Sequence, residues 1–168
     1  DPAPRAASNV AAITTFQRGE LAAGFAAAEV VVEGTWTSPM AHQGYIEPQA
    51  CLASVGPGGQ VELWCSTQGP FMVRSSVALL LGLDIADVRV IPTEIGGGFG
   101  GKTTVYLEPV AVALSRKCGR PVKMQLSREE VFRATGPASA TRVWVKIGAR
   151  ADGTITAMDA RLEYDAGA

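Results

Sequence analysis

Five glycines surround a single phenylalanine in the run Gly96–Gly101, and this run constrains the fold more than any other part of the chain. Glycine costs backbone entropy on folding, and it is needed where φ is positive or where the backbone approaches another group closely. A simple chain reversal does not require so many glycines, although it remains an alternative. The run therefore favours a backbone cradle for a bulky polar ligand.

The run continues into Lys102 and Thr103, so residues 96–103 also satisfy the P-loop pattern G-x-x-x-x-G-K-[S/T]. In a P-loop, Lys102 would reach the terminal phosphates and Thr103 would bind magnesium. A helix starting at Lys102 would hold Pro109 about two turns inside it, which would kink the helix. A helix that begins near Glu108 instead places Pro109 in its first turn, where proline is tolerated. The strand predicted over 121–126 also lacks the acid that a nucleotide site needs near its magnesium.

Residue patterns around the glycine run predict an α+β fold, a mixed sheet with two helices packed on one face, plus a C-terminal β-ribbon. Alternating and β-branched residues predict strands over 29–38, 50–55, 60–66, 87–92 and 121–126, and a hairpin over 142–148 and 154–164. Helical patterns and caps predict helices over 19–28 and 70–83 and from about 108 to 118, and a helical turn over 127–132. We expect three segments: a linker or arm over 1–15, a first domain over 16–135 and the β-ribbon over 136–168.

The composition is typical of a folded chain and gives no sign of a charged surface that would bind a partner. Of 168 residues, 47% are apolar and 18% are charged, and the net charge of −1 gives no footprint for nucleic acid or an anionic membrane. No apolar run approaches the length of a bilayer span, and no signal peptide is visible. Because the chain begins at Asp1 rather than Met, we expect it to be a piece of a larger protein.

The cysteines and the histidine carry no recognisable site. Cys51, Cys65 and Cys118 lack metal-site or disulfide-framework spacing, so we expect buried, reduced thiols. His42 is the only histidine and cannot build a His-based metal site alone. We expect it to be a structural or surface residue.

Several ordered segments together resemble the molybdopterin-binding large subunit of the xanthine dehydrogenase and aldehyde oxidase family. The resemblance covers about residues 16–168. It is carried by Gly44–Ala50, Cys65–Gln68, Glu94–Lys102, Glu108–Leu114, Gly119–Lys123, Ser127–Glu130 and the ribbon ending Tyr164–Gly167.

This resemblance implies a cytoplasmic oxidoreductase that hydroxylates an aldehyde or nitrogen heterocycle, or oxidises carbon monoxide, with water as the oxygen donor. The cofactor would be molybdenum-molybdopterin, in bacteria often the cytosine dinucleotide. Electrons would pass to [2Fe–2S] clusters and FAD on partner subunits or domains. The glutamate that serves as general base would lie beyond Ala168, so residues 1–168 alone are predicted to be inactive.

The family's cofactor residues carry over onto Gln68 and onto Gly97, Gly98, Phe99 and Gly100. By resemblance, the amide of Gln68 and the backbone of Phe99 reach oxygen ligands of the metal. Amide donors stabilise charge on such an oxygen without adding a titrating group. The alternatives are that Gln68 caps the helix starting near residue 70 and that Phe99 fills the core.

One position departs from the purine-oxidising members, which have a glutamate directly after the loop lysine, where this chain has Thr103. A purine substrate is therefore not implied. Two other functions stay open: a P-loop protein whose magnesium-dependent nucleotide binding is abolished by Lys102→Ala, and a cofactor-free subunit retained for assembly.

Overall fold

The computed structural model describes residues 9–165, and their contacts divide into two compact units. The central unit is Ala41–Ala138, and the terminal unit joins the described residues before it to those after it. Residues 1–8 of the predicted linker and residues 166–168 at the end of the predicted ribbon lie outside the described residues. In the described part of the chain, no helix is long and apolar enough to cross a membrane.

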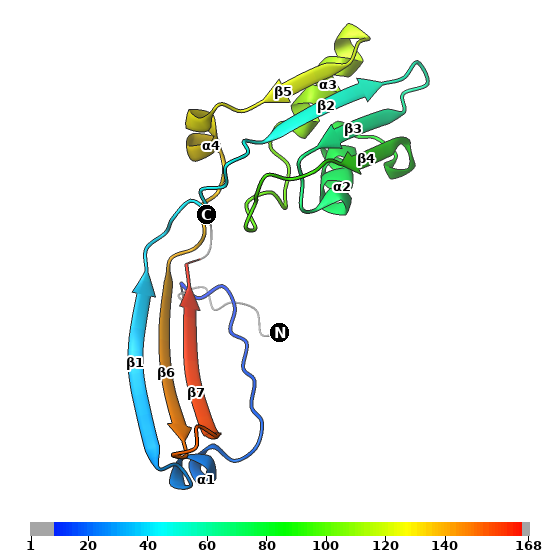
Figure 1. The fold of residues 1–168 in the computed structure, drawn as a ribbon. Helices are drawn as coiled ribbons and strands as arrows, with labels where there is room; N and C mark the ends of the chain where they lie inside the picture. The colour runs from blue at the N-terminus through cyan, green and yellow to red at the C-terminus, as the bar shows by residue number, and fades with distance from the viewer. Residues whose placement is uncertain (1–8, 166–168) are drawn as a thin grey trace. The chain divides into compact units, whose positions relative to one another are not determined.

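The central unit is built on a mixed four-stranded sheet with the strand order β4-β3-β2-β5 (Figure 1). Strands β3 and β4 are parallel, whereas β2 is antiparallel to both β3 and β5. The elements are β2 (Ala50–Val55), β3 (Val61–Cys65), α2 (Pro70–Leu81), the 3-10 helix η1 (Ile85–Asp87), β4 (Val88–Pro92), α3 (Glu108–Cys118), β5 (Val122–Gln125) and α4 (Arg128–Ala134). The predicted mixed sheet is confirmed.

Helices α2 and α3 pack on one face of this sheet, as the alternation of apolar residues predicts. The buried side chains of β3, Val61, Leu63 and Cys65, form one core cluster with residues of both helices. Each helix has a proline at its start and ends at a left-handed glycine, Gly82 and Gly119. Helix α3 begins at Glu108 and not at Lys102, so the prediction drawn from the proline is confirmed.

Helix α4 has a capping box that the sequence analysis did not use. Ser127 accepts the backbone N–H of Glu130, and the Glu130 carboxylate accepts the backbone N–H of Ser127 at 2.7 Å. This bond holds the pKa of Glu130 below its ordinary value. The S-x-x-E spacing is a known helix-start signal, so this helix could have been predicted more firmly.

The terminal unit contains a three-stranded antiparallel sheet with the order β1-β6-β7. Its elements are α1 (Leu21–Ala26), β1 (Val30–Ser38), β6 (Thr141–Ala149) and β7 (Ile155–Tyr164). The predicted hairpin of β6 and β7 is present. The prediction placed residues 30–38 in the first domain, over 16–135. In the structure β1 belongs to the terminal unit, because it pairs with β6 over its whole length and not with the central sheet.

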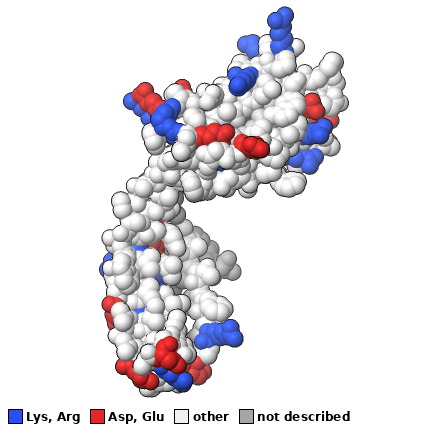
Figure 2. All heavy atoms as spheres, in the orientation of Figure 1, with Lys and Arg blue, Asp and Glu red and all other residues white. Residues whose placement is uncertain are grey.

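One face of the terminal sheet is apolar along all three strands. The registers place Val32 beside Ile147 and Trp36 beside Val143 on this face. Among the described residues of the three strands, none on this face is charged. Trp36 is 59% exposed, and Phe25 of α1 lies against Gly148 on the opposite face. Figure 2 shows basic and acidic side chains interspersed over the central unit.

Candidate functional site

The glycine run and Gln68 meet at one edge of the central sheet. Strands β3 and β4 are parallel and end side by side, with Cys65 paired to Pro92. Gln68 follows β3, and the glycine run follows β4. Because the carboxyl ends of parallel strands meet at one edge, segments that follow them lie together, and this is where open sheets commonly bind ligands.

Gln68 is bonded to the loop in a way that fixes the orientation of its side-chain amide. Its Oε1 accepts the backbone N–H groups of Gly100 at 3.1 Å and Lys102 at 3.2 Å. Only the carbonyl end of the amide can accept two N–H donors, so Nε2 is directed away from the loop backbone. Nε2 has no acceptor among residues 9–165, and the residue is exposed. Gln68 therefore presents two free donors.

The same contacts decide the helix-cap alternative for Gln68. The N-cap residue of α2 is Gly69, and no side chain caps this helix. The backbone N–H of Gly69 instead bonds to Thr67 Oγ1 at 3.0 Å. Gln68 is therefore not a helix cap.

Glycine is required at two positions of the loop for different reasons. A Cβ on Gly98 would lie 2.5 Å from Gln68 Oε1, which is closer than real Cβ contacts. Gly100 has φ +88°, and in this conformation its N–H reaches Gln68. The loop is therefore shaped around the Gln68 amide, which supports the cradle prediction over a simple turn.

Phe99 lies between these two glycines with φ +49°, an uncommon conformation for a residue with a side chain. Its side chain is 76% exposed, so it does not fill the core of this unit. Its backbone N–H has no acceptor among the residues that the structure describes. Backbone donors in such left-handed turns form concavities that bind anionic or oxygen-bearing groups.

Lys102 does not reach outward as a P-loop lysine would. Its side chain is 1% exposed, and Nζ lies 2.7 Å from Glu47 Oε2 and 5.1 Å from the centre of the Tyr45 ring. The Thr103 hydroxyl donates to the Gly100 carbonyl at 3.2 Å. The two residues that a nucleotide site would need are thus engaged within the fold, and the P-loop alternative has no support.

A polar network lies beneath the loop and was not predicted. Buried Tyr45 has its hydroxyl bonded to the side-chain amide of Gln49, and it lies 3.4 Å from Thr135 Oγ1. His42 bonds to the same Thr135 hydroxyl at 2.8 Å and accepts the Gly44 N–H at Nδ1. The prediction that His42 is structural is consistent with these contacts. Burial lowers its pKa, with a smaller contribution from Arg128.

Two of the three cysteines lie opposite each other on neighbouring strands beneath the site and do not form a disulfide. Cys51 and Cys65 face each other in β2 and β3, both buried and free. Burial raises the pKa of each thiol to about 12. Cys118 is free but exposed, so the prediction of burial was wrong for this residue, which is the last residue of α3 and directly precedes its capping glycine.

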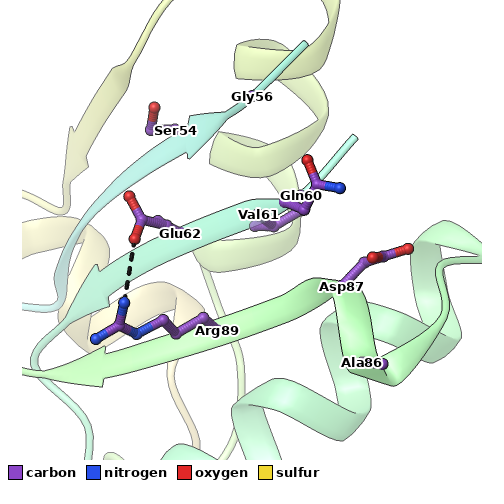
Figure 3. Close-up of a pocket in the computed structure, with 8 residues that line it drawn as sticks. All are labelled: Ser54, Gly56, Gln60, Val61, Glu62, Ala86, Asp87 and Arg89. Carbon is purple, nitrogen blue, oxygen red and sulfur yellow. Dashed lines mark hydrogen bonds and ion pairs between the residues drawn. The ribbon is translucent and has the colours of Figure 1, made fainter. Parts of the chain in front are cut away.

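A cavity of about 350 Å³ lies at the other end of the central sheet. Figure 3 shows Gln60 and Val61 at the start of β3 and Asp87 before β4, with Glu62 bonded to Arg89 across the strands. Since Gln68 and the glycine run follow the carboxyl ends of the same strands, this cavity is not part of the candidate site.

The donor set at the glycine loop suits an oxygen-bearing group held by neutral hydrogen bonds. Nε2 of Gln68 and the N–H of Phe99 carry no formal charge and do not titrate near neutral pH. Within residues 9–165 there is no group of three His, Cys, Asp or Glu side chains that could hold a metal ion directly. The residues present therefore fit a cofactor whose oxygen atoms accept hydrogen bonds from the protein.

Comparisons with known proteins agree on one family. Residues 3–168 match the family described as the molybdopterin cofactor-binding domain. A probable hypoxanthine oxidase of Escherichia coli K12 is 37% identical over 154 residues, which are 92% of this chain and 16% of that protein. Abscisic-aldehyde oxidase of Arabidopsis thaliana is 38% identical over 126 residues, 73% of this chain and 9% of that protein.

Solved structures give the same result. The aldehyde oxidoreductase of Desulfovibrio gigas superposes with a TM-score of 0.72 at 26% identity, covering 88% of this chain and 16% of that one. CO dehydrogenase of Oligotropha carboxidovorans gives a TM-score of 0.64 at 35% identity, over 84% of this chain and 18% of that one. This chain thus spans less than a fifth of each of these four proteins.

Proposed function

Because the chain belongs to the molybdopterin cofactor-binding domain family, we propose that it forms one wall of a molybdopterin site in a molybdenum hydroxylase. The observation that carries the proposal is the fixed Gln68 amide, whose Oε1 is held by Gly100 and Lys102 while Nε2 is free. Two residues would contact an oxygen ligand of the metal: Gln68 through Nε2 and Phe99 through its backbone N–H. Gly97, Gly98 and Gly100 would line the cofactor.

When bound, the cofactor would supply the two-electron oxidation of the substrate carbon, with water as the source of oxygen. The contribution of this chain is electrostatic and geometric. Donors already oriented before the reaction stabilise negative charge on an oxygen at little reorganisation cost. Because neither donor titrates, this stabilisation would not vary with pH near neutrality. We also propose that the molybdopterin is bound as its cytosine dinucleotide.

The remaining machinery would come from outside residues 1–168. We propose that a glutamate beyond Ala168 is the general base and that residues 1–168 alone do not turn over substrate. The rest of a large subunit, with [2Fe–2S] and FAD subunits or domains in the cytoplasm, would complete the enzyme. The charge-free face of the terminal sheet supports such an assembly, since an exposed apolar surface of this kind marks an interface.

One residue of this chain, Thr103, bears on the class of substrate. Thr103 stands directly after the loop lysine, and its hydroxyl is bonded to the Gly100 carbonyl. A short, engaged hydroxyl offers no carboxylate to a purine ring. The proposed substrate is an aldehyde, a nitrogen heterocycle or carbon monoxide, and Thr103 does not supply the carboxylate that purine-oxidising relatives place at this position.

The proposal is tested on the full-length protein that contains this chain. Molybdenum is measured by mass spectrometry, pterin by the fluorescence of its oxidised form, and CMP after acid hydrolysis. We expect one molybdenum, one pterin and one CMP per chain, and oxidation of an aldehyde or heterocycle. A folded protein without molybdenum or pterin would support the cofactor-free alternative, and magnesium-dependent ATP binding lost in Lys102→Ala would support the nucleotide alternative.

A further inference from the structure

Among residues 9–165, the buried ammonium group of Lys102 has one charged partner, Glu47. Lys102 Nζ lies 2.7 Å from Glu47 Oε2, and the side chain of Glu47 is 33% exposed. Lys102 Nζ also lies over the ring of Tyr45, a residue that is 1% exposed, at 5.1 Å from the ring centre. A buried cation without a partner is strongly unfavourable, so Glu47 is what allows Lys102 to turn inward.

Glu47 is also bonded to the start of the glycine loop. The same oxygen, Oε2, accepts the backbone N–H of Gly96 at 2.9 Å. The backbone N–H of Glu47 donates to the Gly96 carbonyl at 3.2 Å. The first glycine of the loop is therefore held by both the side chain and the main chain of Glu47.

The end of the loop is held by a different set of bonds. The backbone N–H of Lys102 donates to Gln68 Oε1, and its carbonyl accepts from the backbone of Gln68 at 2.8 Å and from Thr67 Oγ1 at 3.1 Å. Lys102 thus bonds to Gln68 through its main chain and to Glu47 through its side chain. The ion pair joins the two ends of the loop, and Phe99 lies between them.

We propose that Glu47 and Lys102 are positioning residues for the candidate cofactor site. The ion pair closes the glycine loop at its base, so that the Phe99 N–H and the Gln68 amide keep the orientation described above. Five glycines give the loop a large conformational entropy in the unfolded chain, so contacts that close its base help to hold it in one conformation. The proposal rests on the proposed function, but the closure of the loop can be measured without the cofactor.

The test uses the full-length protein and three variants. Lys102→Met removes the charge and keeps most of the volume, leaving a partly exposed Glu47 that water can solvate. Glu47→Gln keeps an oxygen that can accept the Gly96 N–H and removes the ionic partner. Arg89→Met is the matched control, because its ion pair with Glu62 is exposed and lies at the other end of the same sheet.

Two readouts are taken: hydrogen exchange of the peptide that covers 96–102, and the Mo(V) electron paramagnetic resonance spectrum with the molybdenum content. We expect exchange to rise by about tenfold or more in Lys102→Met and Glu47→Gln, with peptides from α2 and β3 unchanged. Molybdenum content should fall or the spectrum should change in both, whereas Arg89→Met should match the wild type.

Unchanged exchange over 96–102 in both variants would overturn the proposal, as would an unchanged molybdenum content and spectrum. Faster exchange in a protein that binds no molybdenum even as wild type would overturn the proposed function and support the loop closure. If Glu47→Gln does not fold because it leaves the buried Lys102 ammonium without a charged partner, Lys102→Met decides, since it removes the buried cation and leaves the partly exposed Glu47 carboxylate to accept the Gly96 N–H.

Discussion

Gln68 and Lys102 bond to each other in both directions: the Lys102 N–H donates to Gln68 Oε1 at 3.2 Å, and the Gln68 N–H donates to the Lys102 carbonyl at 2.8 Å. The sequence alone does not show which way a glutamine amide points, because a half rotation that exchanges its oxygen and nitrogen leaves the shape of the side chain almost unchanged. Here the loop backbone supplies the two N–H groups that select one orientation. The free donors of Nε2 are a consequence of how the loop folds.

The first prediction concerns Gln68→Glu. The carboxylate can still accept the N–H groups of Gly100 and Lys102, but both donors of Nε2 are lost. We expect kcat of the full-length enzyme to fall by about a hundredfold, the usual cost of one preorganised donor, with hydrogen exchange of the loop unchanged. Gln68→Ala, which loses the acceptor as well, should also raise loop exchange. A Gln68→Glu enzyme with wild-type kcat would show that Nε2 contributes no donor to the reaction.

The second prediction concerns the close approach at Gly98. A methyl group there would lie 2.5 Å from Gln68 Oε1 and 2.6 Å from its Cδ, so Gly98→Ala should displace the amide and lower molybdenum content. The control is Gly82→Ala, where φ is +62° and nothing lies within 4 Å. That variant should lose about 1–2 kcal/mol of stability from backbone strain and keep its molybdenum. Equal molybdenum content in both variants would contradict the role of the close approach.

The third prediction concerns thiol reactivity. The pKa values of Cys51 and Cys65 are raised from 9.0 to about 12, so the folded state disfavours both thiolates. The resulting contribution to stability is complete below about pH 9 and is lost as pH rises toward 12. At about pH 8, iodoacetamide should modify neither residue in the native protein and both after denaturation, as mapped by peptide mass spectrometry. Exposed Cys118 is the internal comparison, and native labelling of Cys51 as fast as Cys118 would be the contrary result.

The fourth prediction concerns His42. Its pKa is lowered from 6.5, so the folded state binds the proton more weakly than the unfolded state. The contribution of neutral His42 to stability is therefore present above pH 6.5 and is lost as pH falls through the folded pKa. The protection of residues 41–49 against hydrogen exchange, corrected for the intrinsic pH dependence of amide exchange, should decrease as pH falls below 6.5, and His42→Gln should remove this decrease. A pH response of the same size in His42→Gln would assign it to another group.

Local signals in the sequence were sufficient for most of the elements. Proline at the start and glycine at the end bounded α2 and α3, and Pro109 correctly separated α3 from the glycine loop. Strand β1 was assigned as a strand, but its partner was not predicted. It pairs with β6, more than a hundred residues later, and local periodicity carries no information about such a distant partner.

The candidate site was predictable in its positions and not in its contacts. The glycine run and the segment ending at Gln68 pointed to a cofactor by resemblance, whereas the pattern G-K-T kept a phosphate site as an alternative, against which Pro109 and the missing acid already argued. The inward direction of the Lys102 side chain depends on Glu47, which precedes it by 55 residues. No sequence motif identifies Glu47 as the partner of Lys102. The ion pair of Lys102 with Glu47 and the position of the Lys102 ammonium over the Tyr45 ring decide between the two functions.

The central claim is that Gln68 and the glycine loop hold the molybdenum cofactor, and the most direct test is crystallography of the full-length protein at the molybdenum absorption edge. The account predicts an anomalous peak beside the loop, with an oxygen ligand of the metal within hydrogen-bonding distance, up to about 3.2 Å, of Gln68 Nε2 and the Phe99 N–H. A molybdenum peak remote from the loop, or a Gln68 amide whose Nε2 points into the loop backbone, would contradict it.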